Sequence, residues 1–93
     1  MTKAEIVSRI AQQTGIEKEV VMTVVEAFME NVKEAMIAGN EVFLRGFGSF
    51  IIKQRAEKVA RNISKNTTIV IPAHSIPAFK PAKVFLSAVK EGK

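Results

Sequence analysis

The sequence EVFLRGFGSFIIKQRAEKVARNISKNTTIVIP, residues 41–72, is where the hydrophobic period of the chain changes from helical to extended. Its apolar residues first recur with a period near two, which predicts a strand over residues 41–45. Gly46-Phe47-Gly48 predicts a tight connection, and Ser49-Phe50-Ile51-Ile52 predicts the start of a second strand. We therefore expect two neighbouring strands joined by a short turn.

The second strand continues into a segment that no core can cover. Residues 53–62 keep the character of an extended chain but contain almost no large apolar residue. The returning strand is predicted over residues 67–71, which are β-branched throughout and are ended by Pro72. An outward strand over residues 51–61 would span about 35 Å, more than the radius of a domain of this size. We therefore expect a hairpin arm, about residues 53–72, that stands out in solvent.

The chain on either side of this hairpin is predicted to be helical. Thr2 and Glu5 have the spacing of a capping box that opens a first helix, and Gly15 suits its end. A second, longer helix is predicted from about residue 17 to residues 38–40, and a final helix over residues 82–90.

The second predicted helix carries two apolar stripes. One contains Met22, Val25, Met29, Val32 and Met36, and the other contains Val21, Val24, Phe28 and Ala35. One stripe can cover the sheet of its own chain, but the rest of the sequence supplies little to cover the other. A homodimer is the economical answer. The alternative is that a monomer fills both stripes.

The composition indicates one folded, basic domain. The 93 residues include 14 Lys and Arg against 9 Glu, a net charge of +5, and 47% of them are hydrophobic. This length predicts a single domain over residues 1–93, and such hydrophobicity is not typical of a disordered tail. The apolar runs fall far short of the roughly 18 to 20 residues that cross a bilayer, and the N-terminus does not resemble an export signal. We expect a cytosolic protein with no membrane association.

Missing residue types exclude most catalytic and metal chemistry. The chain has no Cys, which excludes disulfides, zinc fingers, iron–sulfur sites and thiol nucleophiles. With no Asp and with His74 as the single histidine, neither a Ser-His-Asp triad nor a carboxylate–histidine metal cluster can form from one chain. We expect neither an enzyme nor a cofactor, and we interpret His74 as a loop side chain.

Positive charge is concentrated in the second half of the chain. Residues 1–40 carry four Lys or Arg and six Glu, a net charge of −2, whereas residues 41–93 carry ten and three, a net charge of +7. The cations of the predicted arm are Lys53, Arg55, Lys58, Arg61 and Lys65, against Glu57 alone. Cations on a segment with no core to bury favour contact with nucleic-acid phosphates. The alternative is a solvated edge that charge protects from aggregation.

Other residues leave two interpretations open. Ile63, at the tip of the arm, could be a wedge that enters between base pairs, or a turn residue that folds back on Val59 or Ile69. Lys80 and Lys83 flank the start of the final helix, where they could hold an anion or serve solubility.

An RNA-binding hypothesis rests on Arg45-Gly46-Phe47-Gly48, which matches the start of the RNP1 octamer of RNA-recognition motifs. Ser49 then replaces the expected aromatic residue, and the chain begins with two helices instead of the aromatic-bearing strand that this fold needs. RNA is therefore a secondary partner in our prediction.

Four ordered motifs carry a family resemblance. They are Gly46-Phe47-Gly48-Ser49-Phe50, Arg61-Asn62, Ile71-Pro72-Ala73 and Pro77-Ala78-Phe79-Lys80-Pro81-Ala82-Lys83. With these motifs the chain resembles, over essentially its whole length, the HU/IHF family of bacterial histone-like DNA-bending proteins.

The resemblance implies an α+β fold in an intertwined dimer, either a homodimer or a heterodimer with a related chain. Residues 1–40 would form the helical dimerisation base, residues 41–81 an antiparallel three-stranded sheet with the protruding arm, and residues 82–93 a short C-terminal helix. Two arms would wrap duplex DNA through the minor groove. The expected DNA-binding residues are Lys3, Arg45, Lys53, Arg55, Lys58, Arg61, Asn62, Ile63, Lys65, Lys80 and Lys83. Phe47, Phe50 and Phe79 would be core residues.

The sequence departs from the family pattern at the tip of the arm. The family has a proline wedge after Arg-Asn, whereas Ile63 follows Arg61-Asn62 here, so an apolar wedge is kept without the fixed backbone angle of proline. Asn66 and Ala82 also stand where the family has glycine.

The function that follows from the residues and the resemblance is that of a non-enzymatic architectural protein of the bacterial nucleoid. It would bend and compact duplex DNA largely without sequence specificity. The alternatives are one subunit of a site-selective heterodimer, an RNA-binding module, or a protein-interaction module whose charge serves solubility.

Overall fold

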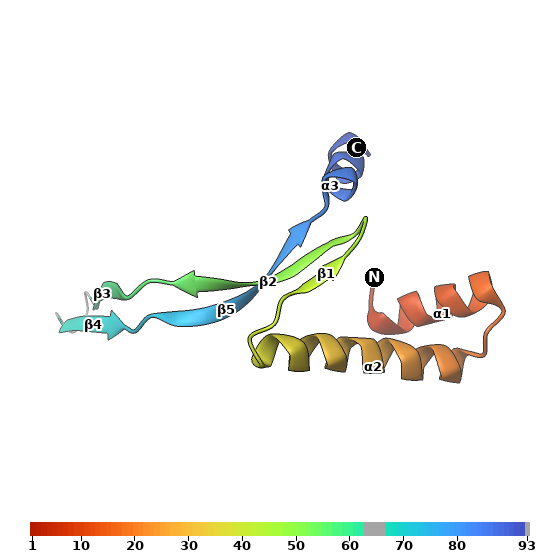
Figure 1. Cartoon of the computed structure of the whole chain (residues 1–93), viewed down its shortest axis with the longest axis horizontal. Helices are drawn as coiled ribbons and strands as arrows, with labels where there is room; N and C mark the ends of the chain where they lie inside the picture. Colours follow the sequence, from red (N-terminus) through yellow and green to blue (C-terminus); the bar gives the residue numbers. More distant parts are fainter. Residues whose placement is uncertain (63–66, 93) are drawn as a thin grey trace.

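The architecture is α+β, as predicted. The computed structural model describes residues 1–62 and 67–92, with side chains described over residues 1–59 and 68–92. Figure 1 shows the helices gathered at one end of a long ribbon of strands, whose other end projects away from them. In chain order the elements are α1 (Lys3–Thr14), α2 (Lys18–Ile37), β1 (Val42–Leu44), β2 (Gly48–Arg55), β3 (Lys58–Asn62), β4 (Thr67–Ile71), β5 (His74–Pro81) and α3 (Lys83–Glu91).

The start and end of α1 follow from its local sequence. The Thr2 hydroxyl accepts a hydrogen bond from the Glu5 backbone N–H at 3.2 Å, and the Thr2 backbone N–H donates to the Glu5 carboxylate at 3.3 Å. This is the predicted capping box. Gly15 ends the helix with φ of 75°, in the left-handed region that glycine enters without strain.

Three antiparallel strands form the central sheet in the order β1-β2-β5, as the family resemblance implied. Phe50 of β2 lies between Val42 of β1 and Phe79 of β5. The strands β3 and β4 form a separate two-stranded sheet at the outer end of the ribbon.

The returning strand predicted over residues 67–71 is confirmed as β4, which ends directly before Pro72, whereas the residues themselves did not predict the next strand, β5. Two residues after Pro72 the chain becomes a strand again, and His74, predicted as a loop residue, is its first residue, opposite Arg55. The sequence of this strand contains Pro77 and Pro81, which sequence patterns associate with turns. The segment is a strand because it pairs with β2. Its prolines are compatible with this pairing, since a proline is tolerated where its missing N–H would point away from the neighbouring strand.

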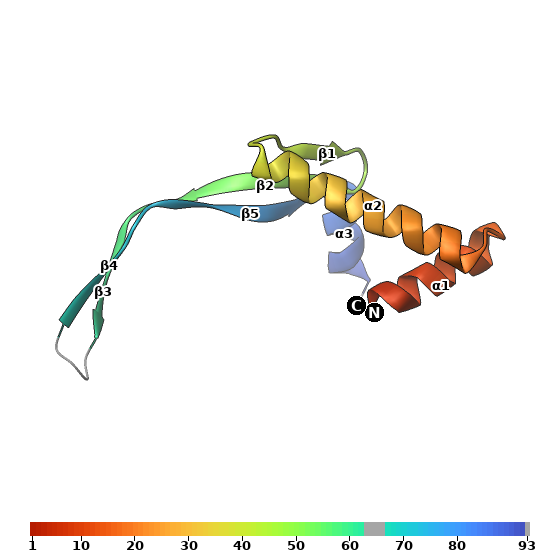
Figure 2. The ribbon, with the colours of Figure 1, turned by 90° about the horizontal axis from the view of Figure 1, so that it is seen from below.

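The arm is therefore one hairpin with an unpaired joint. The last pair of the central sheet is Arg55 with His74, and the first pair of the outer sheet is Lys58 with Ile71. The two sheets share one register, so residues 56 and 57 lie opposite residues 73 and 72. These four residues belong to neither ladder of backbone hydrogen bonds. Figure 2 shows the ribbon bending at this joint.

Pro72 explains the joint through the alternation of hydrogen bonds along β2. The Ile52 backbone N–H donates to the Glu41 carboxylate at 3.1 Å on the β1 side, so even-numbered residues of β2 direct their polar groups away from β5. Odd-numbered residues then form the bonded rows with the returning chain. Extension of the register places Pro72 opposite Glu57, in such a row, where proline has no N–H to give.

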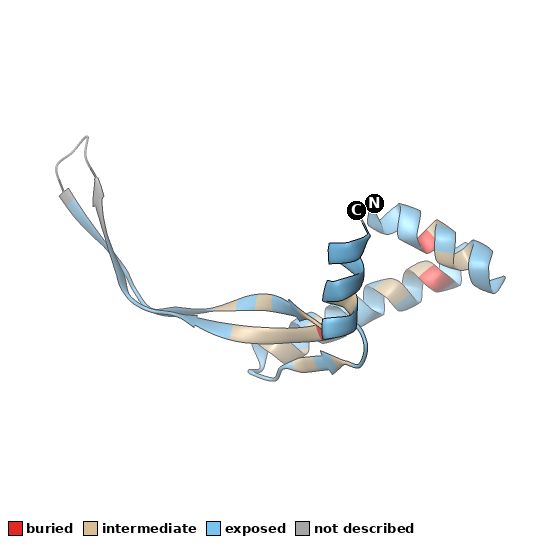
Figure 3. Cartoon of the chain, turned by 90° about the horizontal axis from the view of Figure 1, so that it is seen from above, coloured by how far each residue is buried: buried red, intermediate tan, exposed pale blue. Residues whose placement is uncertain are grey.

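The fully buried hydrophobic core of the described chain is very small. It consists of Val7 of α1 and Val21 of α2, two helices that pack against each other. Figure 3 shows that most of the ribbon is exposed. The second predicted stripe of α2 is covered only in part: Val21 is buried, whereas the Val24 and Phe28 side chains are 61% and 47% exposed. The stripe that begins at Met22 is mostly half-buried, as expected for the one that faces its own chain.

The overall dimensions show how extended the chain is. Its radius of gyration is 19.0 Å, whereas about 12 Å is typical of a domain of this length. Its accessible surface is 7878 Å², whereas a folded monomer of this mass exposes about 5,300 Å². The difference is surface, much of it apolar, that a single copy does not bury.

Candidate nucleic-acid interface

The strand register separates the central sheet into two chemically different faces. Residues directly opposite each other in antiparallel strands have side chains on the same face. Phe50 is paired with Phe79, and Ile52 is paired with Pro77. Ile52 and Pro77 line a hollow together with Met36 of α2, so this face is the one turned toward the helices.

Four phenylalanine rings gather on the helix-side face of the sheet and beside it. The rings of Phe50 and Phe79 have centroids 5.1 Å apart, and Phe47 lies 5.1 Å from Phe79 and 5.6 Å from Phe85. Phe47, Phe50 and Phe79 were predicted as core residues. Their rings do pack together, but Phe47 and Phe79 stay 46% and 39% exposed, so the cluster is not a buried core in the described chain. The rings pack against one another, which argues against the RNP1 hypothesis of a stacking platform for RNA bases. Phe85, from α3, completes the cluster and was not predicted.

The opposite face of the sheet carries predicted DNA-binding cations. Lys53 and Arg55 alternate along the outer half of β2, and Lys80 of β5 is paired with Ser49 on the same face. All three basic side chains are exposed. His74, opposite Arg55, extends the polar row to the joint of the arm. Its Nδ1 atom lies 3.0 Å from the Pro72 carbonyl oxygen, which accepts a hydrogen bond when that nitrogen carries the proton.

Two further cations, Arg45 and Lys83, lie with Lys80 around one hollow at the end of the sheet away from the arm. Arg45, in the turn between β1 and β2, lines this hollow of about 430 Å³ together with Lys80 of β5 and Lys83 of α3. Residues that are far apart in the sequence are thus brought together by the β1-β2-β5 pairing. Lys80 lies on the same face of the sheet as Lys53 and Arg55, and the apolar pair of Ile51 and Ala78 separates it from them.

The arm holds the other predicted contacts. Lys58 begins β3 and is exposed, and Arg61 and Asn62 pair through their backbones with Thr68 and Thr67 of β4. Ile63 and Lys65 lie outside the described residues, so their predicted roles remain predictions.

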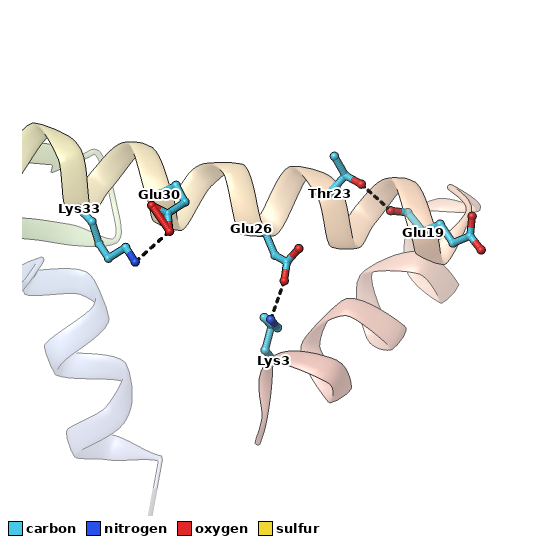
Figure 4. Close-up of polar contacts among 6 residues, drawn as sticks. All are labelled: Lys3, Glu19, Thr23, Glu26, Glu30 and Lys33. Atoms are coloured by element: carbon cyan, nitrogen blue, oxygen red, sulfur yellow. Dashed lines mark hydrogen bonds and ion pairs between the residues drawn. The ribbon is translucent and has the colours of Figure 1, made fainter.

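Lys3 is set apart from the other predicted residues. It is the first residue of α1, and its Nζ atom forms an ion pair with the Glu26 carboxylate of α2 at 2.8 Å (Figure 4). A phosphate would have to compete with this carboxylate for the lysine. A second ion pair, between Lys33 and Glu30 at 2.9 Å, lies further along α2.

Sequence reasoning missed Phe43, which lines the same hollow as Arg45, Lys80 and Lys83. It sits in the middle of β1, with half-buried Val42 and Leu44 on either side. In a strand, Phe43 lies on the face opposite to these two residues. This alternation in the sequence could have predicted an exposed Phe43.

Other kinds of site find no support in the described part of the chain. Over residues 1–62 and 67–92, no group of three or more His, Cys, Asp or Glu side chains could hold a metal ion. None of the helices there has the length and the apolar content that crossing a membrane requires.

A basic sheet face that continues into a charged hairpin, with helices on the reverse side, defines a small nucleic-acid-binding protein of the arm-bearing kind. The family model described as "Bacterial DNA-binding protein" matches residues 1–90, and the chain belongs to this family, which includes HU.

Individual relatives agree with this assignment. The chain is 37% identical over 90 residues to DNA-binding protein HU of Geobacillus stearothermophilus, which covers 97% of this chain and 100% of the relative. It is 38% identical over 91 residues to DNA-binding protein HU of Thermus thermophilus, with 98% and 94% covered. The Anabaena HU–DNA cocrystal structure superimposes with a TM-score of 0.91 at 35% identity, and covers 98% of this chain and 99% of that one.

Proposed function

We propose that this chain is a non-enzymatic architectural DNA-binding protein of the bacterial nucleoid, in the cytoplasm. It binds duplex DNA largely without sequence specificity through the minor groove, and it bends and compacts the DNA. The observation that carries the proposal is the exposed row of Lys53, Arg55 and Lys80 on the sheet face opposite to the helices, continuous with the arm. Membership of the bacterial DNA-binding protein family supports it.

The cations would act by holding phosphates. Lys and Arg contacts to the DNA backbone release condensed counterions, which supplies affinity but little sequence information. Lys53, Arg55 and Lys58 would grip the duplex along the arm, together with Arg61, Asn62 and Lys65. Lys80, Lys83 and Arg45 would hold the flanking DNA, because they line one hollow at the other end of the sheet. Lys3 would contribute after release from Glu26.

Ile63 would be the wedge that opens a base step. An apolar side chain inserted between base pairs unstacks them and kinks the duplex. Replacement Ile63→Ser should therefore reduce DNA bending, measured by fluorescence transfer between the duplex ends, more than it reduces affinity. Equal bending by both proteins would reject the wedge.

The functional unit would be a homodimer. A second copy would cover the exposed apolar residues of α2 and reduce the large exposed surface of the single chain. A two-fold arrangement of the two copies would present two arms to one duplex. A related chain could take the place of the second copy, which would give a heterodimer.

The test is a titration of the full chain against a labelled random-sequence DNA duplex and a single-stranded RNA of equal length, followed by anisotropy at several salt concentrations. Tighter binding to the duplex, with affinity that falls steeply as salt rises, is the expected result because counterion release drives the association.

Each other outcome points to another function. Tighter binding to RNA would overturn the proposal in favour of an RNA-binding module. Binding to neither, or binding that ignores salt, would indicate a protein-interaction module. A strong preference for one duplex sequence over another would indicate a subunit of the site-selective type.

A further inference from the structure

His74 lies where the cation-bearing face of the sheet meets the unpaired joint of the arm. It is the first residue of β5 and is directly opposite Arg55 of β2, so the two side chains are on the same face. The His74 side chain is exposed, and it is the single histidine of the chain. An imidazole differs from the Lys and Arg side chains of this face because its charge changes within the physiological range of pH.

One contact of the His74 ring determines where the proton of the neutral ring lies. The Nδ1 atom is 3.0 Å from the Pro72 carbonyl oxygen. A carbonyl oxygen only accepts hydrogen bonds, so this contact is favourable when Nδ1 carries a proton and unfavourable when it does not. In the neutral ring the single proton is therefore on Nδ1, and Nε2 is an acceptor.

A neutral ring in this position has no donor for a phosphate. Phosphate oxygens are acceptors, and Nε2 of the neutral ring is an acceptor too. A second proton makes Nε2 a donor and gives the ring a positive charge. The contact with Pro72 is kept, because Nδ1 still donates to the carbonyl oxygen. Contact between Nε2 and a phosphate therefore requires the uptake of one proton.

The charged groups around His74 favour a phosphate as the partner of the protonated ring. Arg55 is directly opposite and Lys53 is diagonal to His74 on the same face. Glu57, in the joint, is the carboxylate nearest to them in the register, and β4 has no charged residue. Two positive charges and one negative charge leave this group at +1 before His74 is protonated. A further positive charge is favoured when an anion lies close by, and duplex DNA carries one phosphate about every 1.7 Å along its axis.

We propose that His74 is a proton-linked DNA contact, whose ring takes up a proton from solvent when the duplex binds and donates from Nε2 to a backbone phosphate beside Arg55. The inference rests on the proposed function and deepens it, because it makes the DNA affinity depend on pH. The complex holds one more proton per contact than the free protein and DNA. Affinity for every duplex sequence therefore rises as the pH falls through the range in which histidines titrate.

Anisotropy titrations of one labelled duplex at about pH 6 and about pH 8, at one fixed salt concentration, measure this linkage. The unmodified protein should bind about threefold or more tightly at the lower pH. His74→Gln should lose this gain, because an amide does not titrate. His74→Lys should lose it as well, but its permanent charge should give tighter binding than His74→Gln at the higher pH.

A relocated histidine is the matched control. Gln12 is an exposed residue of α1, outside the sheet. A double variant that combines His74→Gln with Gln12→His has one titrating ring again, but not on the DNA-binding face, and it should bind like His74→Gln at both pH values. The N-terminal amino group is the same in all these proteins, so any effect of its titration cancels. Recovery of the pH dependence in the double variant would overturn the inference.

Proton NMR reads the ring directly, because a single histidine gives one Cε1–H signal for each chain. At about pH 7, within the range in which histidines titrate, addition of the duplex to the unmodified protein should move this signal toward its position in acid. A signal that stays in place, or that moves toward its position in alkali, would contradict proton uptake.

The outcomes distinguish this inference from the proposed function. Absence of salt-dependent binding to the duplex at both pH values would contradict the proposed function. Salt-dependent binding whose affinity does not change with pH, or changes equally in His74→Gln, would overturn the inference alone.

Discussion

At the scale of single residues, Gly48 occupies a position where the neighbouring strand leaves no room for a side chain. A Cβ atom at this position would lie 2.6 Å from the Lys80 carbonyl oxygen and 2.6 Å from Cζ of Phe79. The carbonyl belongs to the paired strand β5 and cannot move independently. Glycine at the start of β2 therefore allows the close approach of the strands beside the ring cluster.

Replacement Gly48→Ala should destabilise the protein by about 1 to 3 kcal/mol, the usual cost of overpacking. The measurement is urea unfolding followed by circular dichroism at one fixed protein concentration. Ser49→Ala is the control, since Ser49 is on the other face and its truncation should cost less than about 0.5 kcal/mol. Equal midpoints for Gly48→Ala and the unmodified protein would contradict the close approach.

The cation row makes a prediction about salt. Arg55→Ala should weaken binding to every duplex sequence, and it should lower the slope of log affinity against log salt by about 0.9, the value for one lost phosphate contact. Arg9→Ala is the matched control, because Arg9 is an exposed arginine of α1, outside the sheet. If the two variants bind alike in anisotropy titrations, the outer half of β2 is not part of the DNA-binding surface.

At the scale of elements, what could be predicted from sequence depends on how local the cause is. The helix α1 is determined by Thr2, Glu5 and Gly15, which lie within or next to it, and its ends were predicted correctly. The strand β5 has no such local signal, because its prolines suggest turns and its conformation comes from pairing with β2. The hollow around Arg45 and Lys80 was out of reach for the same reason. Its residues meet only through the register of three strands.

The joint of the arm gives a prediction that belongs to the hairpin. Pro72→Ala would supply an N–H to the carbonyl of Glu57, because the register places these residues in a bonded row. The ladder should then run through the joint, and the amide introduced at position 72 should be protected in hydrogen-exchange NMR. The Glu57 amide, which faces the carbonyl of residue 72 in the same row, should exchange more slowly because the row closes.

Pro77→Ala is the control for this experiment. Pro77 is opposite Ile52, whose N–H donates to Glu41 on the other side, so an added N–H would point away from β2. The exchange rate of the Glu57 amide should therefore be the same in Pro77→Ala as in the unmodified protein. An unchanged rate for Glu57 in Pro72→Ala would show that the joint does not arise from the missing N–H.

At the scale of the whole molecule, the small core predicts that stability depends on association. The protein should sediment with twice its chain mass of 10.2 kDa, and its Tm should rise with protein concentration. Val24→Glu should give a destabilised monomer, because it places a carboxylate on the exposed apolar surface of α2 that the second copy would cover. Val59→Glu, at a residue 63% exposed on the arm, should leave mass and Tm unchanged. A concentration-independent Tm would contradict the dimer.

The interrupted ladder of the arm also determines the order in which its two halves can form. A hairpin usually closes like a zipper, each new row bringing the next one together. Here the ladder of hydrogen bonds is interrupted between the pair of residues 58 and 71 and the pair of residues 55 and 74, so pairing that begins in the outer sheet cannot propagate into the central sheet. The pairing of β2 with β5 must therefore bring residues 55 and 74 together on its own and close the loop between them. That closure carries an entropic cost of its own. The root of the arm should therefore form with the body, and the outer part should form and open independently of it.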